Sequence, residues 1–234
     1  MTDRLGLLGG MSWQSTAVYY RILNELVAER VGGHASAPVT VWSVDFAEIE
    51  AAQRAGDWDS QGRILNEAAL NLERAGAGLI ALGTNTLHLV ADQITAGLTV
   101  PFVNLIDVVG EFAANAGYSR VGLLGTGYTM NSDLYPAGLA KYGVEVLTPN
   151  EADRVEVHRI IYDELVKGRF TPESKQEYLE IIGRLADAGA EAVVLGCTEI
   201  GLLVSDGEAD VPLLDTTRLH CEVLISAMLK GDPS

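Results

Sequence analysis

Short, almost continuously apolar runs alternate along the chain with longer stretches in which apolar and polar positions mix. Runs of this kind are typical of strands that are buried on both faces. We expect strands at residues 4–9, 39–44, 77–82, 100–105, 120–125, 144–147 and 191–196. We expect helices at residues 14–30, 60–75, 86–96, 107–116, 131–142, 151–167, 173–188 and 216–230. The alternation predicts an α/β fold with parallel sheets that helices cover on both faces.

The chain contains the same pair of strand-and-turn segments twice. RLGLLGGMSW at 4–13 resembles RVGLLGTGYT, which begins 116 positions later, and AGAGLIALGTNT at 75–86 resembles AGAEAVVLGCTE, which begins 113 positions later. Two pairs in the same order at nearly one spacing predict two pseudo-symmetric lobes, each a parallel sheet flanked by helices. We expect lobe 1 over residues 1–105, joined by a C-terminal helix at 214–234, and lobe 2 over 106–213.

One repeated turn carries a thiol and its counterpart does not. Cys197 follows the strand at 191–196, whereas Thr84 stands at the matching position of the first copy. Ligands of parallel α/β sheets bind beyond the carboxyl ends of the strands, so both residues are candidates for chemistry in a cleft between the lobes. A helix starting at Cys197 is expected to lower the pKa of its thiol. The alternative for Cys197 is a small buried apolar residue, and Cys221, among the apolar residues of the last helix, is interpreted as core.

The net charge of the chain limits which kinds of molecule it is expected to bind. The chain has 16 Lys and Arg against 32 Asp and Glu, a net charge of −16, which argues against nucleic acid or an anionic membrane as partner. The longest apolar runs are too short to cross a membrane. Two cysteines form no disulfide framework, so the cytoplasm is the expected location. The dinucleotide fingerprint, the Walker loop and the common metal-binding motifs are missing, so no metal or phosphate cofactor is indicated.

Several stretches together resemble the aspartate/glutamate racemase family, and most closely its bacterial L-aspartate/glutamate-specific branch. They are GLLGGMSWQSTAVYY, SVDFAEIEAAQRAGDW, GTNTLHLVAD, LLGTGYTM, DELVKGRFTPES, LGCTEIGLLV and LLDTTRLH. The resemblance implies a cofactor-independent, homodimeric racemase of acidic amino acids, with two pseudo-symmetric lobes and the site between them. Most members carry a cysteine in both turns. This chain departs from that pattern at Thr84, and the named branch shares the departure.

The resemblance also implies roles for individual residues. Cys197 is expected to remove the Cα proton of the L substrate, and Thr84, which is not held deprotonated, to return a proton on the opposite face, which implies a preference for L substrate. Glu199 is expected to hold the substrate ammonium or to relay a proton, and His88 to support Thr84 unless it is simply an interior histidine. Lys167 is the first candidate for the distal carboxylate, before Arg54 and Lys175. The remaining expected substrate-binding residues are Met11, Ser12, Gln53, Asn85, Thr86, Thr126, Thr129 and Thr198.

Two other functions stay open at this point. A malonate-type decarboxylase needs one protonating thiol and tolerates another residue opposite, and a dicarboxylate-binding protein needs no thiol. The sequence does not rank aspartate against glutamate either, because one methylene in a pocket changes binding by only about 1–3 kcal/mol.

Overall fold

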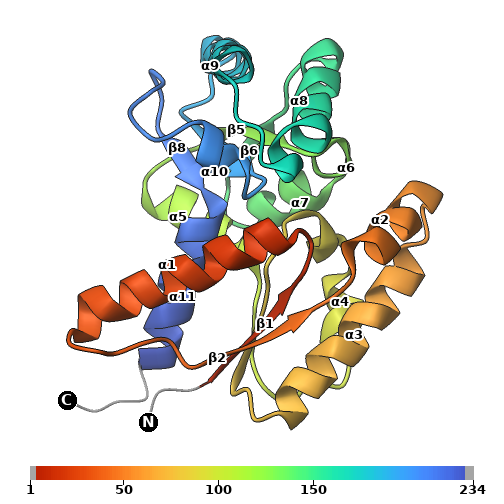
Figure 1. Cartoon of the computed structure of the whole chain (residues 1–234). Coiled ribbons are helices and arrows are strands. Elements are labelled where there is room, and N and C mark those ends of the chain that lie inside the picture. Colours follow the sequence, from red (N-terminus) through yellow and green to blue (C-terminus); the bar gives the residue numbers. More distant parts are fainter. Residues whose placement is uncertain (1–3, 230–234) are drawn as a thin grey trace. The chain divides into compact units, whose positions relative to one another are not determined.

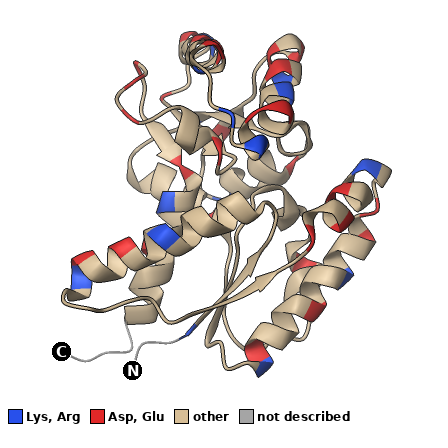
Figure 2. Ribbon diagram, viewed as in Figure 1, with Lys and Arg blue, Asp and Glu red and all other residues tan. Residues whose placement is uncertain are grey.

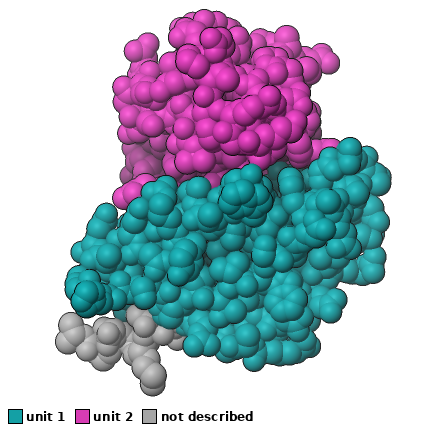
Figure 3. Space-filling view, viewed as in Figure 1, with its two compact units in different colours: residues 1–105, 220–234 teal, residues 106–219 magenta. Residues whose placement is uncertain are grey.

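The computed structural model describes residues 4–229, and the chain divides into two compact units, coloured separately in Figure 3. Unit 1 comprises residues 1–105 and 220–234, and unit 2 comprises residues 106–219. Residues 1–3 of the expected first lobe and residues 230–234 of the expected last helix lie outside the described residues.

Unit 1 is a parallel sheet with helices on both faces (Figure 1). Its strands, in the order β2-β1-β3-β4, are β1 (Leu5–Gly9), β2 (Val39–Ser43), β3 (Leu79–Leu82) and β4 (Phe102–Val103). Its helices are α1 (Trp13–Val31), α2 (Phe46–Ala55), α3 (Trp58–Arg74), the 3-10 turn η1 (Thr86–Val90), α4 (Ala91–Thr95) and most of α11 (Thr216–Leu229). One apolar cluster joins α1 and α11 to the sheet, and a second joins α2, α3 and α4 to it.

Unit 2 repeats this plan. Its strands, in the order β6-β5-β7-β8, are β5 (Arg120–Gly125), β6 (Glu145–Leu147), β7 (Ala192–Gly196) and β8 (Leu213–Asp215), all parallel. Its helices are α5 (Leu105–Asn115), α6 (Gly127–Met130), α7 (Leu134–Ala140), α8 (Glu151–Asp163), η2 (Leu165–Lys167), α9 (Pro172–Asp187) and α10 (Ile200–Leu203). The predicted two-lobed parallel α/β architecture is confirmed.

The repeat extends to the register of the strands. Leu5 pairs with Leu79 in unit 1, and Val121 pairs with Ala192 in unit 2. These four residues are related by the spacings of 116 and 113 positions that relate the repeated segments. The turns that follow β1 and β5, and those that follow β3 and β7, therefore occupy equivalent places at the carboxyl ends of the two sheets.

Several expected elements differ from the observed ones. Apolar periodicity missed α2 and the short strand β8, and it overestimated β4, which pairs over two residues only. The helix expected at 86–96 is instead η1 followed by the five-residue α4. The carbonyl of Thr84 accepts from the ring Nδ1–H of His88, at 2.9 Å, and the backbone amide of His88 bonds to Asn85, which is the 3-10 pattern.

Charge is spread over the helices. Figure 2 shows acidic residues along α1, α3 and α8, interspersed with Lys and Arg. Among the helices formed by residues 4–229, none combines the length and the apolar character needed to span a bilayer.

Candidate active site

Unit 2 gathers polar side chains where β5 and β7 end. The two strands are neighbours whose final glycines, Gly125 and Gly196, pair directly, so Thr126 and Cys197 begin adjacent turns. Thr126 caps α6 by accepting from the amide of Thr129 at 3.3 Å, and the two threonine hydroxyls lie 3.2 Å apart. Thr126, Thr129, Thr198 and Glu199 are buried, and Cys197 is partly exposed. Unit 2 thus brings five of the expected site residues together at the carboxyl ends of its two central strands.

The thiol of Cys197 has a defined partner. Its Sγ donates to Oε2 of Glu199 at a distance of 3.0 Å. Burial raises the pKa of Cys197 well above its ordinary value, and the carboxylate of Glu199 raises it further. The resting state is therefore a protonated thiol that is hydrogen-bonded to a carboxylate, which is the acceptor best placed to receive the thiol proton.

The expectation that a helix lowers the pKa of Cys197 is wrong. The helix that follows, α10, is only four residues long and begins three residues after Cys197. The amides of Glu199 and Ile200 do lower the pKa of the thiol, but burial and the negative charge of Glu199 outweigh them. A thiol whose pKa is raised in this way stays protonated near neutral pH, so its proton must be removed during any reaction in which it acts as a base.

In unit 1, most of the expected site residues follow the carboxyl ends of the two central strands, β1 and β3. Met11 and Ser12 follow β1, and Thr84 to Thr86 follow β3, the neighbouring strand. Ser12 caps α1 through the amide of Ser15, at 3.2 Å, and Asn85 and Thr86 are buried. Gln53 is buried on α2, one turn after Ile49, which shares an apolar cluster with Met11.

His88 is an interior histidine that also supports the Thr84 turn. Its Nε2 accepts from the amide of Leu105 at 3.1 Å, so the ring proton is on Nδ1, which donates to the carbonyl of Thr84. The structure bears out the interior histidine, since His88 is buried, and its contact with Thr84 is to the backbone carbonyl.

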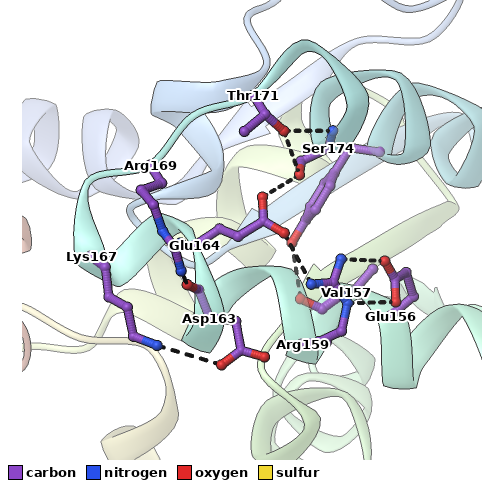
Figure 4. A network of polar contacts seen from close by, with 10 residues as sticks. Glu156, Val157, Arg159, Asp163, Glu164, Lys167, Arg169, Thr171 and Ser174 are labelled. Atoms are coloured by element: carbon purple, nitrogen blue, oxygen red, sulfur yellow. Dashed lines mark hydrogen bonds and ion pairs between the residues drawn. The ribbon is translucent and has the colours of Figure 1, made fainter.

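Lys167 lies on η2, beside the network of polar contacts in Figure 4. Its Nζ is 3.5 Å from Oδ1 of Asp163, and both side chains are more than half exposed. The competing candidates have shorter ion pairs, since Arg54 lies 2.6 Å from Glu50 and Lys175 lies 2.6 Å from Glu208. Of the three cations, Lys167 is the least tightly paired.

The polar network in Figure 4 borders a cavity of about 450 Å³ between α8 and α9. Arg159 and Ser174 both bond to Glu164 there. Tyr178 donates to the carbonyl of Val157 at 3.2 Å, and burial raises its pKa, as do the negative charges of Glu199 and Glu164.

Sequence reasoning missed two residues that shape these turns. His158 on α8 accepts from the amide of Gly127, beside Thr126, and Asp215 at the end of β8 accepts from the amides of Thr217 and Arg218. Burial raises the pKa of Asp215. For His158, the only sequence signal was that His158 and Tyr162 are spaced to lie on one helix face. For Asp215, the signal was the DTT segment that follows an apolar pair.

Fold and site together define a class. The protein is a two-unit α/β protein whose repeated sheets carry equivalent polar turns, with a thiol–carboxylate pair in one turn and a threonine in the other. The chain belongs to the Asp/Glu/Hydantoin racemase family, whose model matches residues 8–224. The family places the protein among the racemases, which are isomerases.

Solved structures and a curated relative agree with this family. A candidate Asp/Glu racemase from Yersinia pestis superposes with a TM-score of 0.90 at 42% identity, covering 97% of this chain and 99% of that one. An aspartate racemase homologue from Pyrococcus horikoshii gives a TM-score of 0.85 at 36% identity, covering 96% and 98%. The broad specificity amino-acid racemase RacX of Bacillus subtilis is 22% identical over 178 residues, which are 76% of this chain and 77% of that protein.

Proposed function

We propose that the protein is an amino-acid racemase that interconverts the L and D forms of aspartate, glutamate or both, with a preference for the L substrate. The observation that carries the proposal is the hydrogen bond from the thiol of Cys197 to the carboxylate of Glu199, at the carboxyl end of β7. The family and the racemases among its structural relatives support the reaction class.

In the proposed reaction, the thiol first becomes a base. The S–H proton of Cys197 moves to Glu199, which leaves a thiolate and a neutral carboxyl group. The thiolate then removes the proton from Cα of the L substrate, so the Cα–H bond breaks, an S–H bond forms and the electron pair remains on the substrate as a carbanion. Since the thiol pKa is raised, the thiolate is a strong base when it forms.

Thr84 completes the inversion. Its hydroxyl passes a proton to the carbanion on the opposite face and recovers one from solvent, and the neutral Glu199 carboxyl group releases to solvent the proton that it took from Cys197. A threonine hydroxyl has no ionised form near neutral pH, so Thr84 acts as a donor and not as a base. The D substrate, which needs a base on the Thr84 side, therefore has the lower kcat, and the preference for the L substrate is a preference in kcat, since kcat/KM is equal for two enantiomers of equal free energy.

The residues proposed to contact the substrate come from both units, and most of them lie at the carboxyl ends of the strands. Met11, Ser12, Gln53, Asn85 and Thr86 would act from unit 1, and Thr126, Thr129 and Thr198 from unit 2, with carboxylate oxygens as their main partners. Lys167 would bind the distal carboxylate, since its ion pair is the longest among the three candidate cations. The ranking of aspartate against glutamate depends on that contact.

The proposal includes a cytoplasmic homodimer that works without a cofactor, on the basis of the family resemblance. Cys197 and Cys221 are both free thiols, which suits a reducing compartment. The mass of the native enzyme in solution tests the dimer, and turnover after extensive dialysis against a chelator tests the independence from cofactors.

Incubation with L-aspartate or L-glutamate in D₂O tests the reaction. Deuterium at Cα together with the D isomer is expected, and both should disappear in a Cys197→Ser variant. Exchange without inversion would remove Thr84 from the mechanism. Stabilisation by ligand without exchange would indicate a binding protein, and release of CO₂ from a disubstituted malonate would indicate a decarboxylase; either result would overturn the proposal.

A further inference from the structure

A histidine from a neighbouring helix holds the turn that carries Thr126 and Thr129. The amide of Gly127, the first residue of α6, donates to Nδ1 of His158 on α8 at a distance of 3.0 Å. A Cβ atom built on Gly127 would lie 3.3 Å from the same nitrogen, so the backbone and the ring are in close contact.

Two aromatic rings fix the orientation of the imidazole. Tyr128, from the same turn, meets the His158 ring edge-on, with ring centroids 5.9 Å apart and an interplanar angle of 77°. Tyr162, one helical turn further along α8, lies against it at 4.7 Å and 44°. His158 is thus held between the helix that bears it and the turn that it contacts.

The hydrogen bond defines the protonation state of the ring. A nitrogen that accepts from an amide carries no proton, so the proton of the neutral ring is on Nε2. Burial lowers the pKa of His158, and the nearby Asp163 carboxylate opposes this effect only in part. The titratable groups that face the ring are Tyr128 from α6 and Tyr162 from α8, and Asp163 is the charged group that acts on it.

We propose that His158 is a positioning residue that holds the Thr126–Met130 turn through its unprotonated Nδ1, and that protonation of His158 releases the turn and weakens substrate binding. This inference rests on the proposed function, in which Thr126 and Thr129 contact a substrate carboxylate. A protonated Nδ1 would point a donor at the amide donor of Gly127, so the contact would change from attractive to repulsive. The helix α6 has only four residues, so the contact with His158 adds to the cap that Thr126 already supplies.

The sign of the pH effect follows from the direction of the pKa shift. Because the pKa of His158 is lowered in the folded protein, the anchoring contact is fully present above the ordinary histidine value of about 6.5. The contact persists below that value and is lost only as the pH falls through the lowered pKa of the folded protein. Substrate affinity should therefore fall on the acid side.

Two variants separate the acceptor from the ring. His158→Asn retains an acceptor, Oδ1, close to the place of Nδ1 but removes the ring and its titration. His158→Phe retains the ring between Tyr128 and Tyr162 but removes the acceptor. We expect His158→Asn to bind L-aspartate and L-glutamate within about threefold of wild type at pH 8, and to lose the acid-side decline. We expect His158→Phe to raise KM about tenfold at pH 8 with a smaller effect on kcat.

The results that overturn the inference are equally specific. Equal KM values for the two variants at pH 8, or an acid-side decline that persists in His158→Asn, would show that Nδ1 does not position the site. His34→Asn, at an exposed position, is the matched control and should behave as wild type. Thermal melts of all variants at pH 8 identify any that lose the fold, and the Asn variant, with its acceptor retained, then decides the outcome.

A direct readout separates this inference from the proposed function. In ¹⁵N-labelled protein without substrate, the Gly127 amide signal should shift as the pH falls from 8 to 5, and should not shift in His158→Asn. An insensitive Gly127 amide in an active racemase would overturn the role of His158 alone. A Gly127 amide that titrates in a protein without turnover would refute the proposed function and leave the anchoring contact established, with binding of L-aspartate at Thr126 and Thr129 then measured from their amide shifts.

Discussion

The Sγ atom of Cys197 lies 3.0 Å from Oε2 of Glu199, two residues further along the same turn. At this distance the Glu199 carboxylate affects the thiol of Cys197 in two opposing ways. Its charge raises the pKa of Cys197, in addition to the larger effect of burial, and it is also the acceptor best placed to receive the thiol proton. Removing the charge should therefore make the thiol more acidic and at the same time make the enzyme slower.

The Glu199→Gln substitution tests this pair of effects. Glutamine retains an acceptor oxygen but carries no charge and takes up no proton near neutral pH. We expect kcat for racemisation of the L substrate to fall by about 10²-fold or more, which is the usual contribution of a positioned acid–base group. We expect iodoacetamide to alkylate Cys197 faster than in wild type at pH 8, because the lowered pKa increases the thiolate fraction.

Mass spectrometry of the Cys197 peptide separates its alkylation from that of the buried Cys221. Glu208→Gln makes the same change of charge at a position paired with Lys175 and is the matched control. Slower alkylation in Glu199→Gln than in the control would show that Glu199 does not raise the thiol pKa, and unchanged turnover would exclude it as the proton acceptor.

The second prediction concerns the asymmetry between the two turns. Thr84→Cys places a thiol at the position equivalent to Cys197, and the D substrate then gains a base on its own side. We expect kcat for conversion of D to L to rise by about tenfold to 10²-fold, and kcat for conversion of L to D to change less, while kcat/KM stays equal in the two directions because enantiomers have equal free energy. Circular dichroism of each pure enantiomer follows both directions.

Thr84→Ser and Thr84→Val complete this series. Serine keeps the hydroxyl and should retain most of the L-to-D activity, whereas valine keeps the shape and removes the donor, so it should lose inversion. If Thr84→Val racemises the L substrate as fast as wild type, the proton on that side comes from another group.

Much of the fold could be predicted because it depends on local patterns that occur twice. Apolar runs ending in glycine located β1, β3, β5 and β7, and the matching spacings of the repeats predicted two equivalent sheets. The strand ends then placed Thr84, Thr126 and Cys197 on sheet edges. These inferences needed only the rule that ligands bind beyond the carboxyl ends of parallel strands.

The electrostatics of the site could not be predicted in the same way. The pKa of Cys197 depends on burial and on the direction of the Glu199 carboxylate, and neither follows from residue spacing. His158 was missed because its partner, the Gly127 amide, is 31 positions away in the chain and belongs to the backbone. The spacing of His158 and Tyr162 places the two rings on one helix face but does not indicate which backbone group the imidazole contacts.

The third prediction concerns the cation on η2. Lys167→Met removes the charge but keeps much of the apolar stem, and we expect KM for the acidic amino acid to rise about tenfold with a smaller change in kcat. The melting temperature should stay near that of wild type, because exposed ion pairs contribute little to stability. Lys141→Met is the matched control, since Lys141 forms a similar exposed pair with Asp107 at 3.6 Å. Equal KM values for the two variants would exclude Lys167 from substrate binding.

The fourth prediction concerns acid stability and the buried His220 in unit 1. Tyr19 donates to its Nδ1 at 3.0 Å, and its Nε2–H donates to the carbonyl of Val103 at 3.1 Å. Burial lowers the pKa of His220 to about 3. The ring is therefore neutral in the folded protein at pH values where the unfolded chain protonates it, below about 6.5. The stability that depends on the neutral ring is complete above that value and decreases as the pH falls toward 3.

Urea titrations between pH 7 and pH 4 measure this effect as a difference between proteins. The free energy of unfolding of wild type should fall with pH more steeply than that of His220→Gln, by up to about 1.4 kcal/mol per pH unit for one proton. His34→Gln, at an exposed position, should follow wild type. Parallel curves for wild type and His220→Gln would mean that His220 is already charged in the folded protein.

The last prediction concerns the close approach of the strands beneath the site. A Cβ atom at Gly196 would lie 3.0 Å from the carbonyl oxygen of Leu124, and one at Gly83, the equivalent position in unit 1, would lie 3.2 Å from that of Leu8. Gly196→Ala should push β7 away from β5, lower the free energy of unfolding by about 1–3 kcal/mol, and reduce kcat by displacing Cys197. Gly183→Ala is the opposite case, since Gly183 is inside α9 with nothing within 4 Å of its added Cβ, and it should gain about 0.5–1 kcal/mol. Chemical denaturation and turnover of both variants check the pair, and a Gly196→Ala enzyme that matches wild type in both would show that this glycine is not needed for the packing of β5 and β7.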